Sequence, residues 1–483
     1  MKKIGILLPL FSLPNDYGIG SMGKEAYQFI DFLAESHVAF WQLLPLGITS
    51  FGDSPYQSLS SMAGGINYID LEALFVDGLI TKEELEENKI ISNHVEYGKL
   101  FETRLNLLKK AHQRFLLHNQ EEYLTFKKNN RDWLDDFSLY MALKAKLNFQ
   151  PLNLWDKDYQ DKESEKCILF KKEYANDIDV HAFGQFLFFK QWYQLKQYAN
   201  KKHIKIIGDM PIYVSPDSAD VFGNHDVFLL DERKNPTLRA GVPPDYFSED
   251  GQLWGNPIYN YDYLRKTKYQ WMLNRFKHYL SMFDIIRLDH FRGYASYYVV
   301  DQDSTTAKNG HWEDGPRMEL FSKVKRMIHQ KLSKRMIAED LGVLTDDVEK
   351  LLKDTHLGGM KVMQFGYPDV SSTNYYKNYR KNQVVYPGTH DNDTILGWYN
   401  SQDEGLQNFV LKDLNTTEEN LVEDFLKAII NSKAKIIIIP FADLLKMNSE
   451  GRINTPGLTS GNWQFRISQD DLSKSIIKEI IKY

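Results

Sequence analysis

Short apolar runs that end abruptly in polar, glycine or proline residues recur along the chain. Most of these runs are apolar throughout rather than alternating, which is typical of strands buried on both faces of a parallel sheet. We expect a strand at each of eight positions: 4–8, 39–46, 204–214, 283–288, 336–338, 360–365, 384–386 and 434–439.

Helical patterns lie between several of these runs. In 25–35 the apolar residues fall on one face of a helix, and segments 318–332 and 421–430 repeat the pattern. Strands that alternate with helices predict an α/β fold with a parallel sheet. Eight such strands predict a (β/α)8 TIM barrel.

Two segments are longer than a barrel connection needs. Residues 71–198 are charged and largely helical in pattern, for example at 80–89 and 100–117, and we expect a helical insertion after the second strand. Residues 215–262 are rich in proline, glycine, aspartate and tyrosine, which predicts a loop-rich insertion. We therefore expect a single barrel over residues 1–483, with insertions at the catalytic face, where long loops after barrel strands lie.

Composition narrows the classes of function. The net charge is −6, so there is no basic excess for binding nucleic acid. The single cysteine, Cys167, excludes an intrachain disulfide and a cysteine-rich metal site. Aromatic residues make up 13% of the chain, which we assign to core packing and compositional bias.

The N-terminus resembles a short secretory signal only at first. Two lysines and an apolar run are followed by Pro14, Asn15 and Asp16, where a cleavage site of small residues belongs. No stretch approaches the length of about 18 apolar residues that a membrane helix needs. We predict a cytoplasmic protein that does not act at a membrane.

Three carboxylates follow predicted strands. They are Asp289 in R-L-D-H-F-R-G at 287–293, Glu339 in A-E-D-L-G at 338–342 and Asp391 in G-T-H-D-N at 388–392. The fourth, fifth and seventh strands lie around one side of the barrel mouth, so we expect the three acids to converge. Arg287 points to the same side of its strand as Asp289 and favours the ionised form of that acid. Asp209 follows the third strand in the same way.

Three convergent acids suit glycoside chemistry, in which one carboxylate attacks, one carboxylic acid donates a proton, and a third group supports the charged transition state. Two other interpretations are open. Acids at strand ends also cap the helices that follow. The acids could also bind a metal ion. Against this second interpretation, no histidines stand at a regular spacing from the acids, and no glycine-rich phosphate loop accompanies them. We predict no metal and no cofactor.

Further motifs extend over nearly the whole chain. They are Y-G-I-G at 17–20, W-Q-L-L-P-L at 41–46, S-P-Y-Q at 54–57, G-D-M-P-I-Y-V at 208–214, A-G-V-P-P-D-Y-F at 240–247, G-Q-L-W-G-N-P at 251–257, N-T-P-G at 454–457 and G-N-W at 461–463. Together with the three acid motifs, in this order, they resemble the 4-alpha-glucanotransferases, also called amylomaltases or disproportionating enzymes.

The resemblance implies a retaining mechanism. Asp289 is then the nucleophile that forms a covalent intermediate, Glu339 the general acid/base and Asp391 the transition-state stabiliser. Arg287 would keep Asp289 ionised, and His390 would bind hydroxyls of the sugar in the cleaved subsite.

The resemblance also implies substrate-binding residues and a flap at 243–254 that excludes water, so that transfer outcompetes hydrolysis. Trp254 would stack on the acceptor sugar. The other implied binding residues are Asp209, Ser54, Tyr56, Gln57, Tyr246, Phe247 and Asn462.

We therefore expect an enzyme that moves alpha-1,4-glucan segments from a maltooligosaccharide or glucan donor to an acceptor chain, acting as a monomer. The family has no β-sandwich domain after the barrel, and the short tail after Ile439 agrees. Two alternatives are an alpha-amylase-type retaining hydrolase, with water as acceptor, and a non-catalytic glucan-binding barrel.

Overall fold

The structure is a computed structural model that describes residues 2–244, 249–342 and 344–473. Parallel strands close a barrel in the order β1-β12-β11-β10-β9-β6-β3-β2. Their bounds are β1 Lys3–Leu7, β2 Phe40–Gln42, β3 Lys205–Met210, β6 Ile285–Leu288, β9 Met336–Ala338, β10 Gly358–Val362, β11 Val384–Tyr386 and β12 Ile436–Pro440. Each predicted apolar run overlaps one of these strands, so the predicted TIM barrel is confirmed.

Strand β10 begins two residues before the predicted run. Gly358 and Gly359 pair with β9, and a Cβ atom at Gly359 would lie 2.3 Å from Oδ2 of Asp340. The strand therefore needs glycine at residue 359, which lies outside the predicted apolar run. Phe365, the predicted end of the run, lies beyond the strand and is exposed.

Helices surround the barrel and account for the predicted helical segments. The predicted helices at 25–35, 318–332 and 421–430 correspond to α1, α12 and α16. The bounds outside the connection from β2 to β3 are α1 Lys24–Glu35, α8 Ala219–Gly223, α9 Tyr261–Lys266, α10 Gln270–Met282, α11 Arg292–Ala295, α12 Arg317–Ile328, α13 Asp346–Thr355, α14 Ile395–Asn400, α15 Glu404–Leu414, α16 Leu421–Asn431 and α17 Phe441–Leu444.

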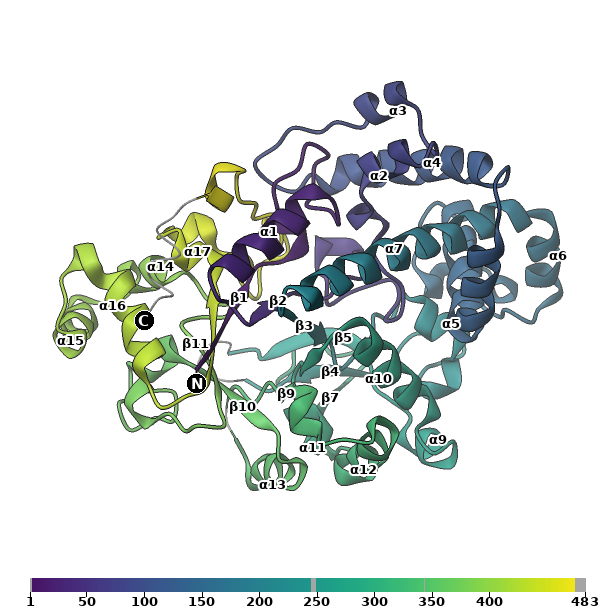
Figure 1. Cartoon of the computed structure of the whole chain (residues 1–483). Coiled ribbons are helices and arrows are strands. Elements are labelled where there is room, and N and C mark those ends of the chain that lie inside the picture. Colours follow the sequence, from purple (N-terminus) through teal and green to yellow (C-terminus); the bar gives the residue numbers. More distant parts are fainter. Residues whose placement is uncertain (1, 245–248, 343, 474–483) are drawn as a thin grey trace.

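The long connection between β2 and β3 is mainly helical and lies at the upper right of Figure 1. Its helices are α2 Leu71–Val76, α3 Lys82–Glu87, α4 Tyr97–Phe115, α5 Glu121–Lys146, α6 Glu165–Glu173 and α7 Ala175–Lys201. Helix α7 contacts α4 and α5 as well as α1 and β3, so one helix serves both this layer and the barrel wall.

A second, antiparallel sheet was not predicted. Its order is β5-β4-β7-β8, with bounds β4 Leu238–Val242, β5 Gln252–Pro257, β7 Ser296–Asp301 and β8 His311–Asp314. Strands β4 and β5 lie in the segment that we expected to be loop-rich, whereas β7 and β8 follow the fourth barrel strand. The pairing of β4 with β7 joins two distant segments, which local patterns do not show.

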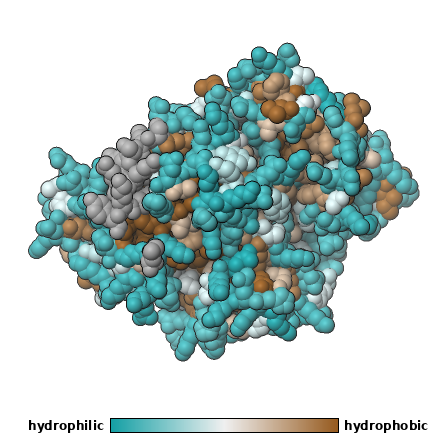
Figure 2. Space-filling view, viewed as in Figure 1, coloured by the Kyte–Doolittle hydropathy of each residue, from teal (hydrophilic) through white to brown (hydrophobic). Residues whose placement is uncertain are grey.

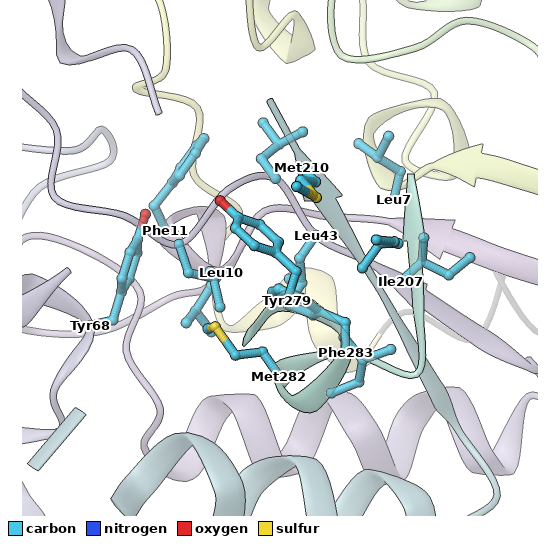
Figure 3. Close-up of a cluster of buried hydrophobic side chains, with 14 of the residues drawn as sticks. Leu7, Leu10, Phe11, Leu43, Tyr68, Ile207, Met210, Tyr279, Met282 and Phe283 are labelled. Carbon is cyan, nitrogen blue, oxygen red and sulfur yellow. The ribbon is translucent and has the colours of Figure 1, made fainter. Parts of the chain in front are cut away.

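The core extends from the barrel interior to the layer of helices. Figure 3 shows Met210 and Ile207 of β3 in one apolar cluster with Tyr279 and Met282 of α10 and the adjoining Phe283. A Cβ atom at residue 208 would lie 2.3 Å from the Phe283 ring, so the glycine lets this ring pack directly beneath the end of β3.

The surface in Figure 2 is largely hydrophilic, with separate apolar patches over the helices between β2 and β3. Among the described residues, no helix is both long and apolar enough to cross a membrane.

Candidate active site

The structure brings Asp209, Asp289 and Glu339 together at the carboxyl ends of three neighbouring barrel strands. Asp289 follows β6 and Glu339 follows β9, and these two strands pair directly. The main-chain N–H of His290 donates to Oε2 of Glu339 at 2.8 Å, which joins the two strand ends. Asp209 lies in β3 opposite Arg287 in β6, so barrel pairing places this ion pair.

One buried cation bridges two of the acids. Nη1 of Arg287 lies 2.8 and 2.7 Å from the two carboxylate oxygens of Asp209, and 2.9 Å from Oδ1 of Asp289. Arg287 is only 3% exposed and Asp209 is fully buried. Burial raises the pKa of Asp209, and the positive charge of Arg287 opposes that rise. The guanidinium thus compensates negative charge that the interior would otherwise disfavour.

Glu339 experiences a different electrostatic environment. Its Oε1 accepts a hydrogen bond from the main-chain N–H of Leu341 at 2.9 Å, in addition to the bond from His290. Burial nevertheless raises the pKa of Glu339 to about 7, and Asp289 adds to the rise while Arg287 opposes it. Near neutral pH this carboxyl group therefore exists in both its protonated and ionised forms, as a general acid/base requires.

Asp391 lies in the loop after β11, and its side chain is 43% exposed. Oδ2 lies 3.3 Å from Nε2 of His390, and Oδ1 accepts a hydrogen bond from the side-chain amide of Asn454 at 2.6 Å. The guanidinium of Arg452 donates to the main-chain oxygen of Asp391 at 3.0 Å. The loop is therefore held by residues from the segment that follows β12.

Tyr56 connects Asp209 with His390. Its hydroxyl lies 3.0 Å from Oδ2 of Asp209 and 2.8 Å from Nε2 of His390, and its ring stacks on the imidazole at 5.5 Å between centroids. A carboxylate can only accept, so the tyrosine O–H donates to Asp209 and the imidazole Nε2–H donates to the tyrosine oxygen. Nε2 of His390 therefore carries a hydrogen. Its buried Nδ1 has no hydrogen-bond partner among the described residues.

Trp254 lies in strand β5, in the antiparallel sheet. Its ring meets the imidazole of His290 edge to face at 4.8 Å, and its main-chain oxygen accepts a hydrogen bond from the amide of Gln57 at 3.4 Å. The structure thus places Trp254 beside the residue that follows Asp289, and Gln57 is bonded to Trp254. Tyr246 and Phe247, the other predicted flap aromatics, lie outside the described residues.

Two predicted binding residues use their polar atoms within the protein. Oγ of Ser54 accepts from the main-chain N–H of Tyr56 at 3.3 Å and closes the turn that carries that ring. Asn462 accepts from the N–H of Thr455 at 2.9 Å and donates to the oxygen of Leu458 at 3.0 Å. Both side chains hold loops that border the site.

Sequence reasoning assigned no role to Asn454, Arg452 or His290. The N-T-P-G motif at 454–457 was the available signal, but its contact with the acid loop depends on how the chain returns after the last strand. In the part of the chain that the structure describes, no group of histidine, cysteine and acidic side chains is arranged to hold a metal ion.

Comparison with known proteins agrees with this geometry. A family model described as 4-alpha-glucanotransferase, glycoside hydrolase family 77, matches residues 8–472. The chain is 42% identical to the 4-alpha-glucanotransferase of Clostridium butyricum over 481 residues, covering 98% of this chain and 97% of the relative. It is 39% identical to that of Thermus thermophilus over 485 residues, covering 98% and 96%.

Solved structures show the same fold. The amylomaltase from Streptococcus agalactiae, solved in complex with acarbose, has a TM-score of 0.96 and 38% identity, and the match covers 100% of this chain and 99% of that one. The amylomaltase from Corynebacterium glutamicum, at 15% identity and a TM-score of 0.79, shares the fold over 100% of this chain and 75% of its own. The chain therefore belongs to the 4-alpha-glucanotransferase (amylomaltase) family and is an enzyme of that activity.

Proposed function

We propose that the enzyme transfers alpha-1,4-glucan segments between maltooligosaccharide or glucan chains by double displacement through a covalent glycosyl-aspartate. One observation carries the proposal: two neighbouring carboxyl groups have opposite environments. Asp289 is bound by a buried guanidinium, whereas burial raises the pKa of Glu339 to about 7. Two carboxyl groups in such different environments can supply a nucleophile and a proton donor at neutral pH.

In the first step, Oδ of Asp289 attacks the anomeric carbon, and protonated Glu339 gives its proton to the departing glycosidic oxygen. The two residues follow directly paired strands. Paired strands lie about 4.8 Å apart, which suits the carboxyl separation of about 5–5.5 Å in retaining enzymes. The glycosidic bond breaks as the aspartyl ester forms, so the reducing-end part of the donor leaves as a free chain.

In the second step, ionised Glu339 accepts the proton of an acceptor hydroxyl. That oxygen attacks the anomeric carbon, the ester bond to Asp289 breaks, and the carboxylate is restored. A pKa of about 7 lets Glu339 alternate between both roles without leaving the pH range in which it works. Asp391 supports the positive charge that develops at the sugar in both steps.

Two imidazole nitrogens at the site are unpaired within the described part of the chain and are the candidates for binding sugar hydroxyls. Nδ1 of His390 and Nε2 of His290 are buried and have no hydrogen-bond partner among the described residues. Burial lowers the pKa of His290 to about 4, so its ring is neutral when the enzyme works. A buried nitrogen without a partner is costly, and a substrate hydroxyl would satisfy it. We place the reacting sugar against His390 and the acceptor sugar near His290 and Trp254.

The alternative is a retaining hydrolase that uses water as acceptor. Incubation with maltotriose distinguishes the two, because transfer gives glucose together with maltodextrins longer than the substrate. Accumulation of glucose and maltose alone would overturn the transfer proposal. The Asp289→Ala variant is the control, since it removes the proposed nucleophile and should yield neither product set.

A further inference from the structure

A segment from the far end of the chain binds the loop that carries Asp391. This segment, residues 449–454, follows β12 and α17, and we call it the C-terminal strap. Its last residue, Asn454, makes two bonds to the loop. The main-chain N–H of Asn454 donates to the oxygen of His390 at 3.1 Å, and its side-chain amide donates to Oδ1 of Asp391 at 2.6 Å.

The rest of the strap fixes the position of this amide. Nε of Arg452 donates to the main-chain oxygen of Asn454 at 2.8 Å, and its Nη2 donates to the oxygen of Asp391. The hydroxyl of Ser449 donates to Oδ2 of Asp393 at 2.8 Å. Asn454 itself is only 9% exposed. The amide therefore approaches Asp391 from a segment that is itself bonded to the same loop at several points.

We infer that Asn454 is a positioning residue for the reaction, which holds the carboxylate of Asp391 in the orientation that faces the substrate. The inference rests on the role proposed for Asp391. The side chain of Asp391 is partly exposed, and apart from this amide its nearest partner is His390 at 3.3 Å. Without the amide, the carboxylate is free to rotate toward solvent, and displacements of about 1 Å at reacting groups reduce rates about 100-fold.

An amide suits this position better than a cation. It donates a strong hydrogen bond to a carboxylate, but it brings no positive charge. The amide therefore leaves the carboxylate of Asp391 without a cation bound to it, so the carboxylate can interact with the cationic transition state, whereas a guanidinium already binds Asp289.

Two variants and one control test the inference. Asn454→Ala removes the amide, and Asn454→Asp puts a second carboxyl group at hydrogen-bond distance from Asp391. Asn448→Asp adds the same charge at an exposed position in the same part of the chain. Each protein is assayed for disproportionation of maltotriose between about pH 4.5 and 8.5, with kcat and KM determined separately and folding checked by thermal melting.

Asn454→Ala should lower kcat by about 100-fold or more at every pH, with a KM within about 3-fold of the wild type. Asn454→Asp should behave differently, because two carboxyl groups in contact share one proton. While that proton is bound, the new group still donates to Asp391 and activity is partly rescued. As the pH rises the proton leaves, so the profile should shift to lower pH by at least about 1 unit. Asn448→Asp should keep the wild-type profile.

A kcat of Asn454→Ala within 3-fold of the wild type would overturn the inference. So would an Asn454→Asp profile that keeps the wild-type shape, because a purely structural defect lowers activity equally at every pH. Asp391→Asn separates this failure from that of the proposed function. If Asp391→Asn is inactive while Asn454→Ala is active, only the role of Asn454 is wrong; if both are active, the role of Asp391 is wrong as well.

Discussion

Asp289 follows a barrel strand and is bound by a buried cation, whereas Asp391 lies in a loop and is bound by a neutral amide and an imidazole. After the roles proposed for the two acids, we call these regions the nucleophile side and the stabiliser side. On the nucleophile side, barrel pairing itself brings Arg287 opposite Asp209. On the stabiliser side, the contacts come from the C-terminal strap, which is not part of the barrel.

The difference separates two physical tasks. The nucleophile side holds a fully buried carboxylate, Asp209, and a partly exposed one, Asp289, so it needs a cation, and its geometry follows from the strands that build the fold. In the proposed mechanism the stabiliser side presents negative charge to a cationic transition state, so donors without charge are the suitable partners for the side-chain carboxylate of Asp391. We therefore expect changes on the nucleophile side to lower stability and activity together, and changes on the stabiliser side to lower activity with only a small loss of stability.

The largest effect should come from Asp289→Ala. Loss of the proposed attacking carboxylate would remove the covalent route, and we expect kcat for maltotriose to fall by roughly 10⁴-fold or more. Product analysis by chromatography measures the rate, with circular dichroism as the folding control. Near-normal turnover would show that another group attacks the sugar.

Arg287→Met should damage both activity and folding. It leaves Asp209 buried without its cation, and breaking a buried ion pair destabilises a protein by about 3–5 kcal/mol. We expect urea unfolding to show a loss of this order, together with at least about a 100-fold loss of kcat. Asn454→Ala is the matched comparison, with a loss of about 1 kcal/mol for one hydrogen bond. Equal losses of stability in the two variants would remove the distinction between the two sides.

The pH dependence of stability should reveal the environment of Glu339. Burial raises the pKa of Glu339 to about 7 in the folded state, so the folded protein binds this proton more tightly than the unfolded chain does. The resulting stabilisation is complete below the pKa of the unfolded chain, and it is lost as the pH rises through about 7. Replacing Glu339 by Gln removes this loss. The stability of Glu339→Gln relative to the wild type should therefore increase as the pH rises from about 4.5 to 7. Above about pH 7 the variant should be the more stable protein by on the order of 1–3 kcal/mol, compared with the difference at low pH. Urea unfolding at several pH values measures the difference, and a difference that does not vary with pH would contradict the raised pKa.

Trp254→Ala should have the smallest effect on turnover. The ring lies against His290, where we place the acceptor sugar, so its removal should open that side of the site to water. We expect the share of hydrolysis products from maltotriose to rise several-fold, while the first displacement, measured with a maltosyl fluoride donor, changes by less than about 5-fold. An unchanged product ratio would show that Trp254 serves only to pack the sheet against the barrel.

Local patterns predicted the barrel strands and the three acids, for a physical reason. A buried parallel strand is an apolar run, and a strand-end acid such as Glu339 stands at the point where that run stops. Local sequence patterns do not predict contacts that join distant segments of the chain. The bond of Asn454 to Asp391 and the pairing of β4 with β7 depend on how the closed barrel brings its connections together. Ser54 shows a different outcome: its side chain was predicted to bind substrate, but in the structure it accepts a hydrogen bond from the main chain of Tyr56 and holds the turn there.

The most direct test of the central claim is to trap the intermediate. Glu339→Gln is mixed with maltotriosyl fluoride, whose leaving group needs no acid, so the first displacement proceeds while the second lacks its base. Mass spectrometry of peptides from the quenched protein then locates the bound sugar. The account predicts one maltotriosyl group on the peptide that contains Asp289, attached to that residue. A maltotriosyl group on any other residue, or hydrolysis of the fluoride with inversion and no labelled peptide, would contradict it.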